Sequence, residues 1–166
     1  VEGRITEIWG AEGVGKSTLA LKHLAEAQKK HPDKRVAYID VEQKMDRAWA
    51  QQHGVDLSRM MLFRPNSAED VADALKELLR SGLISAAVVD SIGAMIPEAE
   101  KEKDADQAVM AQQAKIVTRM VKIAAVEASK FGVSVVIINQ QRANLGYGQP
   151  TTTSGGFALK HASTMK

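Results

Sequence analysis

Short apolar segments alternate with longer helical patterns along most of the chain. The apolar segments have the length of single β-strands and are bounded by polar or turn-forming residues. They cover residues 5–9, 35–40, 60–63, 86–90 and 133–138, and the helical patterns cover residues 16–30, 46–53, 68–80 and 107–131. This alternation predicts an α/β fold with a mainly parallel sheet and helices on both faces. Ligands bind such sheets beyond the carboxyl ends of the strands.

The composition is ordinary for a soluble chain. Of 166 residues, 45% are apolar and 25% are charged, which suits a single domain over residues 1–166. No apolar stretch approaches the ~20 residues that span a bilayer, and the sequence does not start with a secretory signal. The chain has no cysteine, which excludes disulfides and thiolate metal sites. We therefore expect a cytoplasmic protein with no membrane partner.

Charge is unevenly distributed, although the net charge is only +2. Residues 98–106 are mainly acidic, whereas residues 141–166 contain no aspartate or glutamate and carry Arg142, Lys160 and Lys166. A polyanion would therefore prefer the carboxyl-terminal end of the chain.

The first predicted strand runs into GAEGVGKST, which fits the pattern G-x-x-x-x-G-K-[ST] and is followed by a helical pattern. Glycines let backbone N–H groups surround phosphate oxygens, the lysine reaches the outer phosphates, and the next hydroxyl can hold Mg²⁺. This predicts a nucleoside triphosphate site made by Gly10, Ala11, Glu12, Gly13, Val14, Gly15, Lys16, Ser17 and Thr18. The alternative is a glycine-rich turn that only caps the helix.

Two carboxylates follow other predicted strands and would lie at the same edge of the sheet. Asp90 can hold Mg²⁺ through water, or it can be a simple turn residue. Glu42 can orient and deprotonate a water that attacks the γ-phosphate, or it can be a solvated loop acid. With a phosphate loop in the same sheet, we favour the metal interpretation for Asp90.

Trp49 and Asp46 share one face of the short helical segment at 46–53. The indole can fill a core or lie flat on a purine ring, and the pattern does not distinguish the two. Asp46 can accept a hydrogen bond from an exocyclic amine of the base.

Gln140 lies at the tip of the last predicted strand, two residues beyond its apolar run, and a long glycine-rich loop follows at 141–154. Its neutral amide can touch a γ-phosphate without holding it tightly and so report the nucleotide state to the loop, or it is a plain polar residue at a strand end. The loop combines Arg142, Tyr147, glycines and a row of hydroxyls. This mixture suits a single nucleic-acid strand, and the alternative is a surface loop with no ligand.

The helical pattern at 107–131 carries Lys115, Thr118, Arg119 and Lys122 at helical spacing on one face. Such a face is usually only solvated, but beside a loop without acidic residues it is a candidate contact for a nucleic-acid backbone. Met110, near the start of this helix, either packs in the fold or slips between bases as an apolar wedge.

The motifs GAEGVGKST, IDVE, VVDS, INQQR and TTTSGG occur in this order and spacing. As an ordered set they resemble the core of bacterial and phage RecA recombinases over nearly the whole chain. The resemblance implies a protein that uses ATP and Mg²⁺, binds single-stranded DNA, and pairs it with homologous duplex DNA. It also implies a twisted sheet in which the strand with Gln140 lies between the phosphate-loop strand and the strand that ends in Asp90.

The resemblance also implies roles for the matching residues. For ATP binding and hydrolysis these are Lys16 for the phosphates, Ser17 and Asp90 for Mg²⁺, Glu42 as the catalytic glutamate, Asp46 and Trp49 for adenine, and Gln140 as the switch to DNA. Residues 98–110 match the family's first DNA loop, and residues 141–154 match its second. Together with the basic face of the helical pattern at 107–131, these loops give candidate DNA contacts at Met110, Lys115, Thr118, Lys122, Arg142, Asn144, Tyr147, Gly155 and Gly156.

The sequence departs from the family pattern in several places. Trp49 stands where a tyrosine is usual, His161 stands where a phenylalanine is usual, and the loop that carries Tyr147 is slightly shortened. Nothing matches the family's N-terminal oligomerisation helix or the later core strands whose lysines reach a neighbour's ATP. We therefore expect a fragment or minimised core, with self-association into filaments a property of the full-length family.

Three functions are compatible with these motifs. The first is a DNA-dependent ATPase and recombinase, the second is a nucleotide-gated DNA-binding module with little hydrolysis, and the third is a small-molecule kinase built on the phosphate loop. The kinase needs an acceptor pocket and arginines that close over the phosphates, and only Arg142 lies near the predicted strand ends. The first function is favoured.

Overall fold

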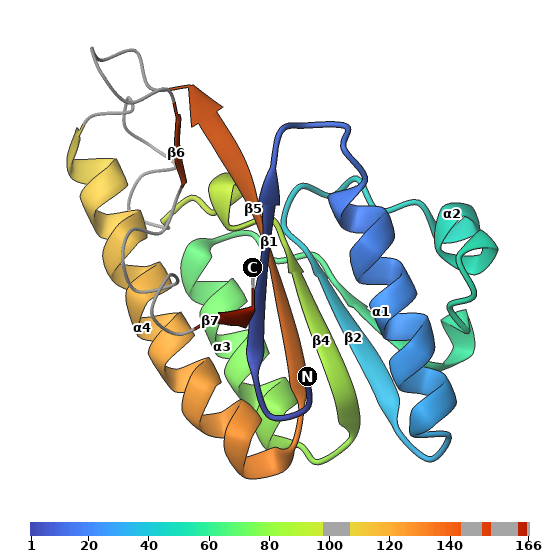
Figure 1. Ribbon diagram of the computed structural model, residues 1–166. Coiled ribbons are helices and arrows are strands. Elements are labelled where there is room, and N and C mark those ends of the chain that lie inside the picture. The colour runs from blue at the N-terminus through green and yellow to red at the C-terminus, as the bar shows by residue number, and fades with distance from the viewer. Residues whose placement is uncertain (98–106, 144–150, 154–162, 166) are drawn as a thin grey trace.

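A twisted sheet with strand order β3-β2-β4-β5-β1-β7 forms the centre of the molecule (Figure 1). The computed structural model describes residues 1–97, 107–143, 151–153 and 163–165, with side chains described for residues 1–97 and 111–140. The strands are β1 (Ile5–Gly10), β2 (Arg35–Asp40), β3 (Met60–Phe63), β4 (Ile84–Asp90), β5 (Ser134–Ala143) and β7 (Ser163–Met165). Neighbours on this path pair in parallel, and β6 (Thr151–Thr153) pairs antiparallel with β5.

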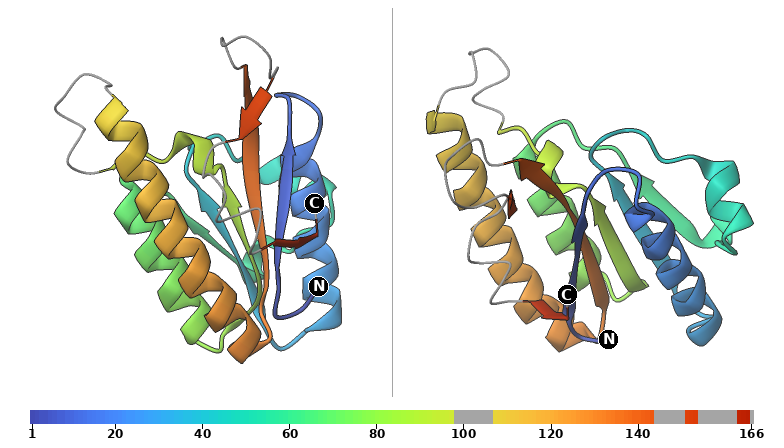
Figure 2. Two further views of the ribbon diagram at one scale, coloured as in Figure 1. Left: turned by 60° about the vertical axis from the view of Figure 1, so that its left-hand side comes forward. Right: turned by 45° about the horizontal axis from the view of Figure 1, so that its top comes forward.

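Helices cover both faces of this sheet (Figure 2). One face carries α1 (Lys16–Lys30) and α2 (Arg47–Gln52), and the other carries α3 (Ala68–Arg80) and α4 (Gln107–Phe131). Short 3₁₀ turns lie at Leu57–Arg59 and Ile92–Ala94. None of the described helices is long and apolar enough to cross a lipid bilayer.

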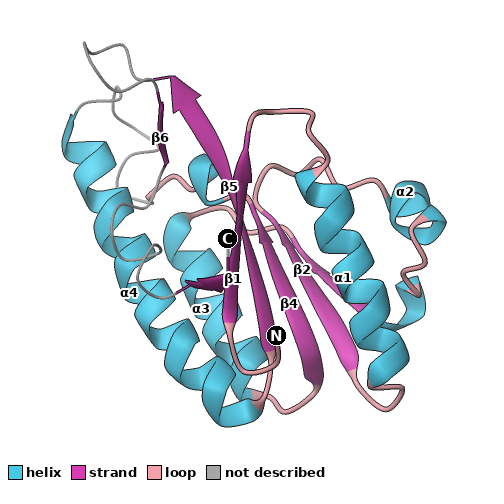
Figure 3. Cartoon of the chain, in the orientation of Figure 1, coloured by secondary structure: helices cyan, strands magenta, loops and turns pink. Residues whose placement is uncertain are grey.

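Each face of the sheet has its own buried core, because successive strand residues point to opposite faces. In β2, Val36 and Tyr38 pack with the α1 layer, whereas Ala37 and Ile39 pack with the α3 and α4 layer. Burying one large aliphatic side chain contributes about 1.5–3 kcal/mol, so these two cores hold the strand ends in fixed relative positions. The loops that follow β1 and β2 both leave the same edge of the sheet (Figure 3).

The predicted α/β fold, with a mainly parallel sheet and helices on both faces, is confirmed. The strand order places β5 between β1 and β4, as the resemblance implies. Helices α1, α3 and α4 have their predicted bounds. Helix α2 is shorter than predicted because Asp46 and His53 are its caps.

The predicted end of β5 was wrong. The strand continues beyond residue 138 to Ala143, so Gln140 lies within it and pairs with Gly10 of β1. Part of the predicted loop also forms β6, because three β-branched threonines favour an extended backbone and pair with residues 141–143. Strand β7 was not predicted, since it has only three residues and is held by pairing with β1 at the sheet edge.

Candidate functional site

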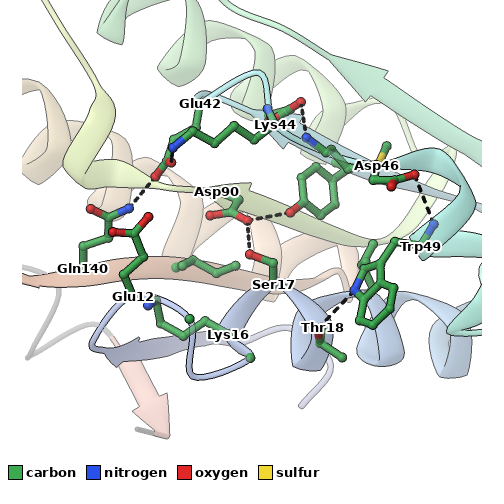
Figure 4. Close-up of a pocket in the computed structure, with 17 residues that line it drawn as sticks. Glu12, Lys16, Ser17, Thr18, Glu42, Lys44, Asp46, Trp49, Asp90 and Gln140 are labelled. Carbon is green, nitrogen blue, oxygen red and sulfur yellow. Dashed lines mark hydrogen bonds and ion pairs between the residues drawn. The ribbon is translucent and has the colours of Figure 1, made fainter.

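A cavity of about 350 Å³ opens at the carboxyl edge of the sheet (Figure 4). The loop between β1 and α1 forms one side, the segment from the end of β2 into α2 forms another, and β4 and β5 contribute one polar residue each. Its lining consists of Glu12, Gly13, Gly15, Lys16, Ser17, Thr18, Leu21, Tyr38, Asp40, Glu42, Lys44, Met45, Asp46, Trp49, Asp90, Ile138 and Gln140. Most of the predicted nucleotide residues therefore meet in one place. Gly10, at the end of β1, and Ala11 and Val14, in the loop that follows, lie outside this lining.

The predicted phosphate loop has a backbone that requires glycine at two positions. Gly13 has φ of 78° and Gly15 has φ of 89°, both in the left-handed region where other residues are strained. Gly15 is also the N-cap of α1 and supplies no side-chain cap, so the helix start offers its backbone N–H groups and positive dipole end. Lys16 Nζ donates to the carbonyl oxygens of Gly10 at 3.0 Å and Ala11 at 2.6 Å.

Asp90 lies at the centre of a small cluster of oxygen atoms. Its Oδ2 accepts hydrogen bonds from Ser17 Oγ and from the Tyr38 hydroxyl, each at 2.6 Å. Burial raises the pKa of Asp90; the two hydrogen bonds oppose this effect, but the pKa stays above its ordinary value. Burial and the nearby Asp90 carboxylate raise the pKa of Tyr38, so its phenol remains a donor. The cluster joins the phosphate loop, β2 and β4.

Glu42 accepts hydrogen bonds from three different side chains. Its Oε1 accepts from Ser91 Oγ at 2.8 Å and from Gln140 Nε2 at 2.5 Å, and its Oε2 accepts from Lys44 Nζ at 2.9 Å. Burial raises the pKa of Glu42, but the hydrogen bonds from Lys44 and Ser91 and the charges of Lys44 and Lys16 bring it below its ordinary value. Glu42 is therefore an ionised and oriented carboxylate at neutral pH.

Trp49 lies at the side of the cavity formed by α2 and is 46% exposed, so it is not a core residue. Its Nε1 donates to Thr18 Oγ1 at 3.2 Å, and its ring meets His53 edge-on at a centroid distance of 4.5 Å. Asp46 Oδ1 caps α2 by accepting from the backbone N–H groups of Ala48 and Trp49. The cap fixes the position from which the indole reaches the cavity.

The predicted DNA contacts lie away from this cavity or outside the described residues. Lys115, Thr118 and Lys122 line an open groove along α4, together with Ala114, Arg119 and Ile123. Met110 belongs to the first turn of α4, and Arg142 belongs to β5, opposite Thr152 of β6. The remaining predicted contacts, Asn144, Tyr147, Gly155 and Gly156, lie outside the described residues, as does His161.

The sequence prediction missed four polar side chains of the site, namely Tyr38, Asp40, Lys44 and Ser91. Tyr38 was read only as part of an apolar strand, although the pairing of β2 with β4 brings its hydroxyl to Asp90. Ser91 directly follows Asp90, and Lys44 follows Glu42 by two residues. For Ser91 and Lys44, closeness in sequence to a predicted site residue was the signal that could have identified them.

Comparison with known proteins matches the whole chain, residues 1–166, to a family described as the RecA N-terminal domain. The proteins named Protein RecA from Chlorobium chlorochromatii and Mesoplasma florum are each 38% identical to it over 99% of this chain. The Protein RecA of Sinorhizobium medicae is 37% identical over 99% of this chain. The matches cover 46%, 50% and 46% of these relatives, so the chain spans about half the length of the curated relatives it matches.

Proposed function

This chain belongs to the RecA family, and we propose that it is the ATPase core of a recombinase that binds single-stranded DNA, pairs it with homologous duplex DNA and hydrolyses ATP. The hydrogen bond from Gln140 Nε2 to Glu42 Oε1 supports this proposal best. It connects a carboxylate suited to activating water with the strand that leads toward the predicted DNA loop. One amide thus links the two proposed sites.

The nucleotide would bind with its phosphates in the loop before α1. Lys16, which now donates to two loop carbonyls, would instead donate to an outer phosphate oxygen, and the start of α1 would add backbone N–H groups. The adenine would stack on the exposed part of Trp49, whose indole Thr18 orients. Asp46 would accept from the exocyclic amine in addition to capping α2.

The donor atoms beside the phosphate loop fit Mg²⁺. This ion usually keeps several waters and takes one or two protein ligands together with phosphate oxygens. Within the described part of the chain, no group of three or more His, Cys, Asp or Glu side chains could hold a metal. Ser17 Oγ and Asp90 Oδ2 lie 2.6 Å apart, and this pair suits an ion that arrives with the nucleotide. Bound there, the ion would neutralise charge on the β- and γ-phosphates.

Glu42 would act as the general base for hydrolysis. It takes a proton from the attacking water while a bond forms between the water oxygen and the γ-phosphorus. The bond from the γ-phosphorus to the bridging oxygen breaks, which leaves ADP and inorganic phosphate. The low pKa of Glu42 keeps it ionised before the reaction, and Ser91 holds its orientation.

Single-stranded DNA would run along the groove on α4 and along the predicted DNA-binding segment that follows β5. Lys115, Thr118 and Lys122 would contact the phosphate backbone. The other proposed DNA contacts are Met110, Arg142, Asn144, Tyr147, Gly155 and Gly156. Because lysine contacts release counterions from DNA, the affinity should fall with rising salt.

ATP turnover, measured with and without single-stranded DNA at several protein concentrations, tests this function. Turnover that DNA stimulates supports the ATPase and recombinase. DNA binding that responds to nucleotide, with negligible turnover at every concentration, would instead identify a gated DNA-binding module. ATP consumption that requires a small acceptor and ignores DNA would identify a kinase.

Gln140 gives a sharper test of the link between the sites. A non-hydrolysable ATP analogue should tighten DNA binding by about 1 to 3 kcal/mol, the usual size of coupling between two sites, and DNA should tighten binding of the analogue by the same amount. Gln140→Ala should erase this coupling and leave the affinity for each ligand alone nearly unchanged. Gln52→Ala, at the exposed end of α2, serves as the control and should keep the coupling. Equal DNA affinity with and without the analogue in the unmodified protein would contradict the switch.

A further inference from the structure

The cavity contains a second lysine, Lys44, on the side opposite Lys16 (Figure 4). Its Nζ donates to Glu42 Oε2 at 2.9 Å, and its side chain is 71% exposed while that of Glu42 is 17% exposed. The ammonium group therefore lies at the open side of the cavity, paired with the proposed general base.

The backbone that carries Lys44 is fixed, although its side chain is exposed. The carboxylate of Asp40, only 3% exposed, accepts hydrogen bonds from the backbone N–H groups of Lys44 and Met45, each at 3.1 Å. The Lys44 side chain thus starts from a defined point beside the cavity and can change partner without moving the loop.

Charge in the cavity is unbalanced in a way that a phosphate would increase. The lining has five carboxylates, from Glu12, Asp40, Glu42, Asp46 and Asp90, and only two lysines, Lys16 and Lys44. A triphosphate adds further negative charge. Lys16 would contact the phosphates only from the side of the loop between β1 and α1. Lys44 is therefore the described cation of the lining that can meet the outer phosphate from the opposite side.

The ion pair between Lys44 and Glu42 is weak enough for another anion to replace Glu42. The Lys44 side chain is 71% exposed, so its ammonium group stays hydrated, and an ion pair with such an exposed partner contributes little to stability. A hydrogen bond from an ammonium group to a phosphate oxygen is charge-assisted, and phosphate carries more charge than a carboxylate. When a γ-phosphate enters the cavity, it can compete with Glu42 for Lys44.

We propose that Lys44 moves from Glu42 to the γ-phosphate when ATP binds, which gives the site a preference for ATP over ADP and frees Glu42 Oε2 for the attacking water. This inference rests on the proposed nucleotide site. ADP lacks the γ-phosphate, so with ADP bound Lys44 stays on Glu42 and the carboxylate stays occupied. Lys44 is thus a positioning residue for Glu42 and a specificity residue for the nucleotide.

The test is calorimetric titration of the protein with Mg²⁺–ADP and with Mg²⁺ and a non-hydrolysable ATP analogue. Lys44→Gln should weaken binding of the analogue about tenfold and change ADP binding by less than about twofold, because only the analogue offers a partner to Lys44. Lys44→Arg should restore most of the preference. Lys29→Gln is the matched control, because Lys29 is similarly exposed, at 68%, and also pairs with a glutamate, Glu26, but lies at the far end of α1. It should change neither affinity.

The outcomes separate this inference from the proposed function. If the unmodified protein binds neither nucleotide, the nucleotide site itself is wrong, and the inference fails with it. If it binds both and Lys44→Gln leaves their ratio unchanged, the nucleotide site stands and the role of Lys44 is refuted. A loss of preference in Lys44→Gln that Lys44→Arg restores, with unchanged thermal unfolding, supports the exchange.

Discussion

Two regions of the molecule each pair a glutamate with a cation, and the two carboxylates differ in the number of side chains that contact them. At the cavity, Glu42 accepts from three side chains, and its cation, Lys44, is mostly exposed. Between α3 and α4, Arg80 directs both Nε and Nη2 at one oxygen of Glu127, whose side chain is only 9% exposed. Polar contacts at the cavity can be replaced by those of a ligand, whereas the pair between the helices has no competitor and serves the fold.

The comparison predicts that changes at the cavity alter binding without altering stability, and Lys16→Ala should show this most strongly. The variant should lose detectable ATP binding, because the Lys16 ammonium, which donates to two backbone carbonyls, is the proposed donor to the phosphates. Calorimetric titration measures the binding. The thermal unfolding midpoint should stay close to that of the unmodified protein, and unchanged affinity for ATP would contradict the phosphate loop assignment.

Glu42→Gln should give the second largest effect, on the rate rather than on binding. The amide keeps the shape of the side chain but cannot take a proton, so turnover should fall about 10²-fold or more while ATP still binds. A steady-state ATPase assay beside a binding titration separates the two quantities. Turnover at the unmodified rate would make Glu42 a solvated loop acid, despite its three donors.

The same two regions show which parts of the molecule the sequence could predict. The phosphate loop is one continuous segment between a strand and a helix, so its residues could be named from local pattern. The contact from Tyr38 to Asp90 depends on the pairing of β2 with β4, and the contact from Arg80 to Glu127 depends on the packing of α3 against α4. Partners separated by about fifty residues leave no local signal, because their meeting is set by tertiary packing.

The ends of the strands were predicted less well for a related reason. An apolar run marks the buried part of a strand, so β5 was expected to stop where its polar residues Asn139 and Gln140 begin. The strand continues because its backbone pairs with β1 as far as Gln140 and then with β6. Backbone pairing does not require apolar side chains, and hydropathy therefore could not reveal it.

Arg80→Gln should give the smallest effect and should act on stability alone. It leaves the largely buried carboxylate of Glu127 without its cation, so the unfolding midpoint should fall while ATP affinity stays unchanged.

Arg80 lowers the pKa of Glu127 in the folded protein, and a carboxylate with a lowered folded pKa contributes stability above its unfolded pKa. This contribution disappears as the pH falls below about 4.3 and through the folded pKa. The difference in midpoint between the variant and the unmodified protein should therefore be largest near neutral pH and shrink in acid. Lys29→Gln, whose partner Glu26 is 70% exposed, should show almost no difference at neutral pH. A deficit in Arg80→Gln that is the same at every pH would mean that Arg80 acts through packing of its side chain and not through its charge.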